Sequence, residues 1–164
     1  MSLYPTGVCI IATQIETQAP FGITVNSLTS LSLEPPLLMW NLQKSSDTYK
    51  DWRDAEFFGV SMLRIEQAHL AQRFAVRGQH DFEQGELARS ETGCPILEEC
   101  LATFECKLHA RYEEGDHVIM IGEVLAASPR SDLAPLTYHK GLYGSVDTGR
   151  VLNQATNDAN RGRR

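Results

Sequence analysis

Apolar and polar residues alternate strictly from Phe104 to Tyr112, and this segment constrains the fold more than any other. A period of two is the pattern of a β-strand that packs one face on a core. The turn "EEGD" (Glu113–Asp116) follows, and then the apolar stretch His117–Ala127. The sequence therefore predicts a long antiparallel hairpin. Its two faces are predicted to carry Phe104, Cys106, Leu108, Ala110 and Tyr112 on one side, and Glu105, Lys107, His109 and Arg111 on the other.

Shorter strand patterns occupy the first third of the chain. The continuous apolar run "GVCIIAT" (Gly7–Thr13) predicts a buried strand, and "ITVNSLTS" (Ile23–Ser30) predicts a second strand with polar alternation. Glu34–Pro36 breaks the pattern, because neither proline can donate to a ladder. The segments Leu37–Leu42 and Glu56–Leu63 predict two further strands.

Two segments have helical character. Lys44–Ala55 offers Ser46 as an N-cap, and Glu66–Ala75 places three apolar side chains on one side. Residues 76–95 are polar and predict a long loop, whereas Pro135–Val146 predicts a loop and a short strand. Strands outnumber helices too heavily for a doubly wound fold, and no G-x-G-x-x-G follows a strand. We therefore expect a mainly β domain, an antiparallel barrel with short flanking helices.

Composition narrows the class of protein. The length of 164 residues predicts one domain, here residues 1–150, with a polar tail over residues 151–164. The net charge of −6 argues against a nucleic-acid binder, which needs a basic surface. No apolar run reaches the ~18 residues of a membrane span, and no signal-peptide pattern opens the chain, so we expect a cytoplasmic protein with no membrane partner.

The four cysteines lack the close pairs of a metal site. They stand at Cys9, Cys94, Cys100 and Cys106, and none forms a C-x2-C pair. Cys9 lies in an apolar run and Cys106 in the alternating strand. We therefore expect buried free thiols, with neither zinc nor a disulfide.

The stretch from Phe21 to Trp40 carries more hydroxyl groups than a core needs. Backbone amides beside Pro35–Pro36, together with the serine and threonine hydroxyls, suit a planar acceptor-rich ligand or a phosphate. An edge strand whose hydroxyls face water is the alternative. The segment "KSSDTY" places Lys44 and two hydroxyls at a predicted helix start, which suits an anion, although an ordinary cap with a solvated lysine explains the same residues.

Two downstream motifs could face the same ligand. In "GDH", Asp116 precedes His117 at the start of a strand, which suggests an oriented imidazole, although a rim histidine is the simpler interpretation. In "YHKGLYG", Tyr138 and Tyr143 flank Gly141 and could cover a flat ring, or could simply close the end of the barrel.

Taken in order, these segments resemble the flavin reductase-like, FMN-binding split-barrel family. The matching pieces are "PTGVCIIAT", "GITVNSLTSLSLEPPLLMW", "KSSDTY", "FFGVSML", "QAHLAQRFA", "FECKLHARYEEGDHVIMIGEV" and "PLTYHKGLYG", which span about residues 5–145. The resemblance implies an antiparallel split β-barrel of Greek-key type. Leu28 stands where many of these reductases have an aromatic residue, and we expect the helix that usually precedes "PTGV" to be absent or cut to Met1–Tyr4.

The resemblance also implies a function and a set of site residues. It implies an NAD(P)H:flavin oxidoreductase that takes FMN or FAD, forms a homodimer and supplies reduced flavin to a partner monooxygenase. His117 is expected on the nicotinamide side of the flavin. The residues expected to bind flavin are Thr24, Val25, Asn26, Ser27, Leu28, Thr29 and Ser30 at the ring and ribityl chain, Lys44, Ser45, Ser46 and Thr48 at the phosphate, and Tyr138 and Tyr143 near the same pocket.

Hydride transfer needs no catalytic dyad, because the cofactors carry the chemistry. The protein has only to hold two rings face to face and to stabilise charge on the flavin. An FMN-binding protein without NAD(P)H activity, serving as a flavin store, sensor or electron carrier, is the main alternative. An oxidase of the pyridoxamine phosphate type is a third, which the lack of a basic cluster beyond Lys44 disfavours.

Overall fold

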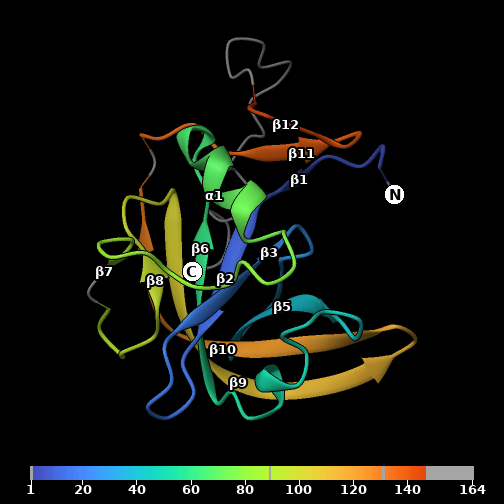
Figure 1. Ribbon diagram of the computed structural model, residues 1–164, viewed down its shortest axis with the longest axis vertical. Coiled ribbons are helices and arrows are strands. Elements are labelled where there is room, and N and C mark those ends of the chain that lie inside the picture. Colours follow the sequence, from blue (N-terminus) through green and yellow to red (C-terminus); the bar gives the residue numbers. More distant parts are fainter. Residues whose placement is uncertain (1, 89, 131, 147–164) are drawn as a thin grey trace, which may run out of the picture.

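A curved seven-stranded antiparallel sheet forms the body of the computed structural model, which describes residues 2–88, 90–130 and 132–146 (Figure 1). Its strand order is β3-β2-β6-β9-β10-β5-β4. The bounds are β2 Cys9–Thr13, β3 Phe21–Val25, β4 Thr29–Leu33, β5 Pro36–Gln43, β6 Phe57–Met62, β9 Ala102–Glu114 and β10 His117–Pro129. This is the mainly β antiparallel architecture that the sequence predicts.

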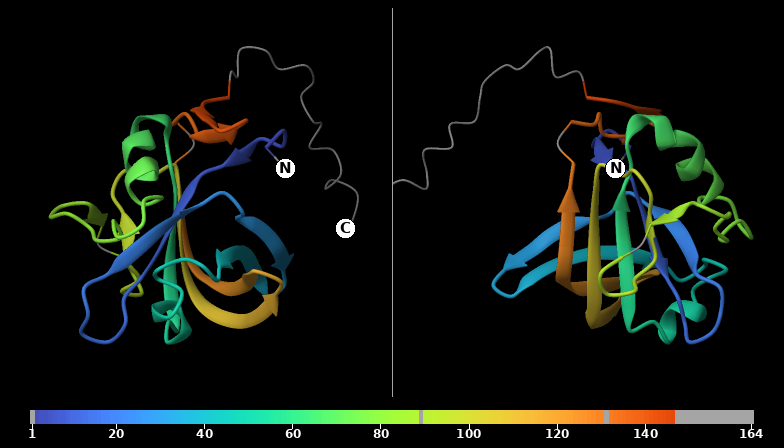
Figure 2. Two further views of the ribbon diagram at one scale, coloured as in Figure 1. Left: turned by 45° about the vertical axis from the view of Figure 1, so that its right-hand side comes forward. Right: turned by 90° about the vertical axis from the view of Figure 1, so that its left-hand side faces the viewer.

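Smaller elements surround the sheet. A three-stranded sheet and a two-stranded sheet lie beside it, and the helical segments are short (Figure 2). Their bounds are β1 Thr6–Gly7, β11 Thr137–His139 and β12 Leu142–Gly144 for the first, β7 Leu87–Ala88 and β8 Ile96–Leu97 for the second, and η1 Asp51–Arg53, η2 Ile65–Gln67 and α1 Ala68–Arg73 for the helices. The short helices flank the sheet, as expected.

The predicted single strand Ile23–Ser30 is in fact two strands, and this prediction was wrong. It divides into β3 and β4, which lie at opposite edges of the large sheet and do not pair with each other in the described residues. Residues 26–28 cross between the two edges. There the Ser27 hydroxyl accepts a hydrogen bond of 3.0 Å from the Asn41 amide, so a side chain replaces the ladder partner that a continuing strand would supply. The sheet is therefore curled and open between β3 and β4, which agrees with a split barrel.

The predicted hairpin is confirmed as β9 and β10. Glu114 pairs with His117 across Gly115 and Asp116, and Gly115 has a φ of +57°, which glycine adopts without steric cost. The predicted faces are wrong in two places. A register shift between the pairs Gly122–Leu108 and Ile121–Ala110 interrupts the alternation, so Tyr112 is 56% exposed whereas Arg111 reaches the Trp52 carbonyl. Glu105, expected on the polar face, is buried. Burial alone would raise the pKa of Glu105, but hydrogen bonds from Thr92 and from the Glu91 and Thr92 amides hold it below its ordinary value.

An aromatic cluster fills the inside of the curl. Trp40 meets Trp52 and Phe58 edge to face, with ring centroids 5.0 and 5.9 Å apart. Trp52 comes from Lys44–Ala55, where the predicted helix is absent and turns with the short η1 take its place. The Ser46 hydroxyl is bonded to the Thr48 hydroxyl and accepts from the Thr48 amide, which favours a turn over a helix start. The guanidinium of Arg111 donates to the carbonyls of Trp52, Arg53 and Ala55 and so fixes the end of the segment.

A second apolar cluster lies between β2 and α1. Ile10 and Val8 contact Leu70, Ala71 and Phe74 of the helical segment, as its spacing predicts. Because Ile11 belongs to the aromatic side, β2 is buried on both faces, which explains its unbroken apolar run. The four cysteines are buried free thiols, as predicted, and burial is the main cause that raises the pKa of Cys9 and of Cys106 to about 12.

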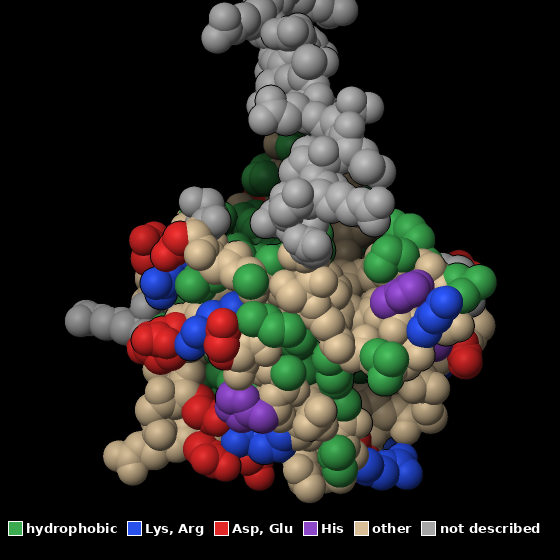
Figure 3. Space-filling view, turned by 90° about the horizontal axis from the view of Figure 1, so that it is seen from above, with side chains coloured by type: hydrophobic (Ala, Val, Ile, Leu, Met, Phe, Trp, Pro, Cys, Tyr) green, Lys and Arg blue, Asp and Glu red, His purple; other side chains and the backbone are tan. Residues whose placement is uncertain are grey.

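The surface is mixed in charge. Seen from the end that carries α1 and β11–β12, acidic and basic side chains lie interspersed, with hydrophobic side chains between them (Figure 3). None of the helices in residues 2–88, 90–130 and 132–146 is long and apolar enough to cross a membrane. The predicted polar tail, residues 151–164, lies outside the described residues.

Gly59→Ala should destabilise the fold strongly. A Cβ on Gly59 of β6 would collide with the Pro95 carbonyl and lie 2.7 Å from Ile96 Cγ2, so backbone would have to move. We expect the free energy of unfolding to fall by about 3 kcal/mol in urea denaturation. Gly7→Ala is the matched control, because nothing lies within 4 Å of its Cβ position. A Gly59→Ala protein as stable as the Gly7→Ala protein would contradict the predicted close approach.

Candidate functional site

A cavity of about 410 Å³ lies between the end of β3, the end of β5 and the loop that follows α1. Its walls include seven of the residues expected at a flavin site, drawn from segments far apart in the sequence: Thr24, Val25, Asn26, Ser27, Ser45, Ser46 and His117. A cavity of about 660 Å³ adjoins it and shares Asn26, Ser27 and Asn41 with it. The second cavity also contains Leu28, Thr29 and Tyr138. We call the two cavities together the groove.

The two ends of the groove differ in chemistry. Hydroxyl groups and a guanidinium lie at one end, from Ser45, Ser46 and Arg77. Aromatic rings lie at the other, from Tyr4 and Tyr138. A groove of this kind suits an elongated ligand with an anionic end and a flat aromatic end.

Two of the hydroxyls in the stretch Phe21–Trp40 already form hydrogen bonds within the protein. Thr24 of β3 donates from its hydroxyl to the Ala71 carbonyl at 2.9 Å, and Ser27 accepts from the Asn41 amide. These bonds join the groove wall to α1 and to β5. Thr24 and Ser27 therefore fix the wall in place, and Asn26, which is exposed, is the neighbour left to face a ligand.

The segment Lys44–Thr48 is a turn and not a helix start, so the predicted helix N-terminus is absent. The hydroxyls of Ser46 and Thr48 lie 2.9 Å apart, and Thr48 is buried behind the groove. Lys44 does not line the groove, because its ammonium pairs with Glu113 at 3.1 Å. The cation at this end is instead Arg77, whose Nη2 donates to the Ser45 carbonyl at 3.1 Å.

His117 stands on the groove with its ring oriented by its neighbour. Its Nδ1 lies 2.7 Å from Asp116 Oδ1, and that hydrogen bond is the main reason that the pKa of Asp116 is lowered. The Lys44 amide donates to the Asp116 carbonyl at 2.9 Å, which ties the hairpin to the end of β5. With Nδ1 turned to the carboxylate, Nε2 is the nitrogen left for a ligand.

The remaining predicted residues lie at or behind the rim. Tyr138 lines the aromatic end, and Tyr143 packs against it with ring centroids 5.4 Å apart. Burial, and then the neighbouring Tyr138, raises the pKa of Tyr143. Ser30 lies on exposed β4 and does not line the groove.

Several groove residues were not predicted from the sequence. Asn41 and Gln43 lie two apart on β5, and two side-chain amides in an otherwise apolar strand are the sequence signal that marks them. Arg77 and His80 come from the predicted loop, where no spacing marked them as a pair. The other unpredicted groove residues of the first cavity are Ile23, Leu42, Asp47, Phe74 and Ala75.

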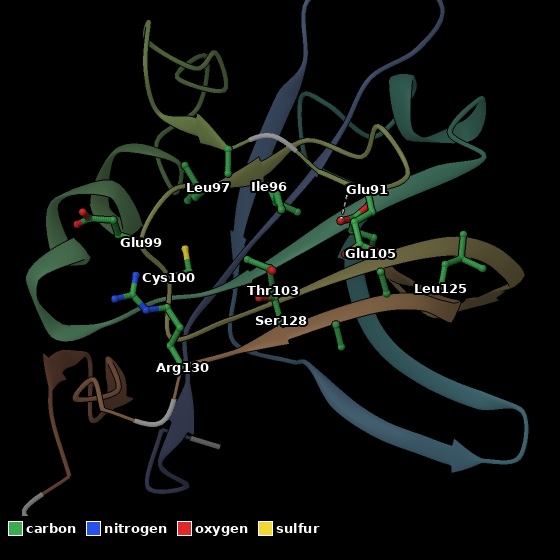
Figure 4. Close-up of a pocket in the computed structure, with 13 residues that line it drawn as sticks. Glu91, Ile96, Leu97, Glu99, Cys100, Thr103, Glu105, Leu125, Ser128 and Arg130 are labelled. Carbon is green, nitrogen blue, oxygen red and sulfur yellow. Dashed lines mark hydrogen bonds between the residues drawn. The ribbon is translucent and has the colours of Figure 1, made fainter.

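A further cavity of about 350 Å³ shares no residue with the groove (Figure 4). It lies between the β7–β8 pair and the sheet, with Thr103 and Glu105 on β9 and Leu125 on β10. Glu105 there already accepts hydrogen bonds from Glu91 and Thr92. This cavity gathers none of the predicted site residues, so the groove is the candidate site.

Comparison with known proteins agrees with this choice. The chain matches the flavin reductase like domain over residues 1–147. It is 36% identical to an NADH-dependent FMN reductase, SmoA, of Agrobacterium fabrum, over 88% of this chain and 81% of that protein. Among solved structures, it resembles SgcE6, an NADH:FAD oxidoreductase of Streptomyces globisporus, at 30% identity with a TM-score of 0.82, over 90% of this chain and 88% of that one.

A second solved structure is similar to the same extent. It is BorF, the flavin reductase component of a bacterial two-component tryptophan halogenase, at 32% identity with a TM-score of 0.80. The match covers 88% of this chain and 92% of that one. The family match spans all of the described residues, and the fold and the groove agree with it. The chain belongs to the flavin reductase like domain family.

Proposed function

We propose that this protein is an NAD(P)H-dependent flavin reductase, whose flavin lies in the groove. The observation that carries the proposal is the convergence of predicted flavin-site residues, from distant segments, on one groove. The names of the relatives SmoA and SgcE6 include NADH, which supports NADH as the electron donor here. Residues 1–150 would form the single flavin-binding domain.

The residues present fit a flavin. Ser45, Ser46 and Arg77 would hold its phosphate, because hydroxyls and a guanidinium are strong donors to phosphate oxygens. Asn26 and the backbone of residues 25–29 would face the polar edge of the ring system, with Tyr138 at the aromatic end. Of the other two expected phosphate ligands, Thr48 would support Ser46 from behind, whereas Lys44 is paired with Glu113 outside the groove.

A bound flavin would accept hydride at N5 from the nicotinamide of NAD(P)H. The protein's part is to fix orientation and to supply donors in place before the reaction. His117 would lie against the nicotinamide, with its ring held by Asp116. We propose that this single oriented imidazole is the catalytic residue.

We also propose a partner and a cellular compartment for the protein. A reductase of this kind would supply reduced flavin to a partner monooxygenase, and the halogenase named with BorF supports a two-component system. Four buried free thiols suit a reducing compartment such as the cytoplasm.

The reductase activity is tested by anaerobic stopped-flow mixing of the protein and FMN with NADH or NADPH. We expect the visible flavin band to bleach on mixing, faster with NADH, and to return when air is admitted. Bleaching must depend on the protein, so FMN and nucleotide alone are the control. Tight FMN binding without bleaching by either nucleotide would leave a flavin carrier, store or sensor as the function.

His117→Ala should separate binding from hydride transfer. Loss of the imidazole removes a group that orients the nicotinamide, so the rate of flavin reduction should fall about tenfold. The Kd for FMN should change less than about twofold, since His117 is only one wall of the groove. His109→Ala is the matched control, because His109 is exposed on β9 and lies away from the groove. An unchanged rate in His117→Ala would remove it from the mechanism.

We propose a homodimer that covers β4. β4 pairs with β5 alone in the described sheet, and Leu31 and Leu33 on it are 47% and 88% exposed. The β4–β5 hairpin extends to the side of the body (Figure 2, right). Sedimentation equilibrium should give twice the monomer mass, and Leu33→Lys should weaken association at least about tenfold, because it places a charge in an apolar contact. A wild-type monomer at micromolar concentration would contradict this.

A further inference from the structure

A histidine and a carboxylate join two loops at the phosphate end of the groove. His80 Nε2 lies 2.9 Å from Asp47 Oδ1, and His80 Nδ1 lies 3.1 Å from the Gly22 carbonyl oxygen. The Gly78 amide donates to Asp47 Oδ2 at 2.7 Å. We call Asp47 and His80 the clasp, because they hold the loop after α1 against the turn that contains Ser45 and Ser46.

The geometry of the clasp depends on the protonation of the imidazole. Both ring nitrogens face acceptor oxygens, a carbonyl on one side and a carboxylate on the other, and only the imidazolium can donate to both. A neutral ring that donates to Gly22 turns the Nε2 lone pair toward the carboxylate, where the Gly78 amide at 3.3 Å, already bound to Asp47, is the donor that the described residues offer to Nε2. A neutral ring that donates to Asp47 instead turns the Nδ1 lone pair toward the Gly22 carbonyl, so either neutral form loses one of the two bonds of the clasp.

The clasp stands at a boundary between two cavities. Asp47 and His80 line the groove on one side and a second cavity of about 380 Å³ on the other. That second cavity also contains Asp51 and Asp81, so it is acidic, whereas the groove side carries Arg77. The clasp therefore separates a site suited to a phosphate from a surface that repels one.

We propose that His80, in its protonated form, is a positioning residue of the phosphate end of the flavin site. The hydrogen bond from His80 to Asp47 holds Ser45, Ser46 and Arg77 in one arrangement. The positive charge of the ring also offsets the negative charge of Asp47, which would otherwise face the phosphate. This inference rests on the proposed function. Because only the imidazolium donates to both acceptors, the affinity for FMN contributed by the clasp is present where the ring is protonated, at low pH, and is lost when the ring gives up its proton.

Three carboxylates and one cation lie around His80. Asp47 contacts the ring, Asp81 is its chain neighbour and Asp51 lies across the second cavity, while Arg77 is the cation on the same loop. Partial desolvation would raise the pKa of Asp47, but hydrogen bonds from the Gly78 amide and from His80 outweigh it and lower that pKa. Asp47 is thus a carboxylate throughout the range in which histidine titrates.

The test compares the Kd of FMN with that of riboflavin, which lacks the phosphate, by flavin fluorescence at pH 6 and pH 8.5. At pH 6 the His80→Gln protein should bind FMN about tenfold more weakly than wild type, the loss expected for one hydrogen bond between charged groups. At pH 8.5 the two proteins should bind FMN alike. The phosphate of FMN also titrates near pH 6, but this affects both proteins and cancels in their ratio.

Asp47→Asn, which removes the charge of the partner, should abolish the same pH-dependent difference. Riboflavin should bind all the proteins alike at both pH values. His69→Gln is the matched control, because His69 is exposed and its Nδ1 contacts only the Glu66 carbonyl of its own helical segment.

A ratio of FMN affinities that does not change with pH, or an equal effect on riboflavin, would overturn the inference alone. Failure of the wild type to bind either flavin at both pH values would overturn the proposed function with it. If a variant does not fold, as judged by thermal melting, the wild type decides. Its ¹⁵N-histidine spectrum at pH 6 should show both ring nitrogens of His80 protonated, and a neutral ring there would overturn the inference.

Discussion

The passage of the chain from one edge of the sheet to the other, across residues 26–28, is the constraint on which the groove depends. A strand that continued through Ile23–Ser30 would place these residues on a single edge. Instead the backbone amide of Asn41 donates to the Ser27 hydroxyl, where a continuing strand would offer a carbonyl. β3 and β4 lie at opposite edges of the curled sheet. Because the sheet is open between β3 and β4, Asn26 and Ser27 line both cavities of the groove, and Leu28 lines the second.

Much of the fold could be predicted from local patterns. The β9–β10 hairpin has strict alternation and a glycine at its turn, and β2 has the unbroken apolar run of a strand that is buried on both faces. The break in Ile23–Ser30 could not be predicted in this way, because its residues keep a strand-like alternation through the crossing. In Lys44–Ala55 the bonds between Ser46 and Thr48 favour turns over the expected helix, and the end of the segment is fixed by Arg111 from a distant strand, a contact that no local pattern shows.

In the candidate site, too, some residues could be predicted from local motifs and others depend on the tertiary structure. Ser45, Ser46 and His117 could be found from motifs, since each stands in a short polar pattern beside a strand. The identity of the cation could not, because Lys44 is held by Glu113, a residue 69 positions away, while Arg77 reaches the groove from a loop. Which of two nearby cations serves a site depends on where their counter-ions fold, and that is a property of the tertiary structure.

Charge also shapes what the groove can bind. A protein with a net charge of −6 repels an anionic ligand at long range, so a phosphate must be held by local donors that are fixed before it arrives. Asp47 stands beside these donors and would oppose the phosphate if it were free. Its hydrogen bonds to His80 and the Gly78 amide turn both carboxylate oxygens toward the protein. If His80 is protonated, as we propose, the same pairing that closes the loop would also offset the charge of the carboxylate nearest to the proposed phosphate site.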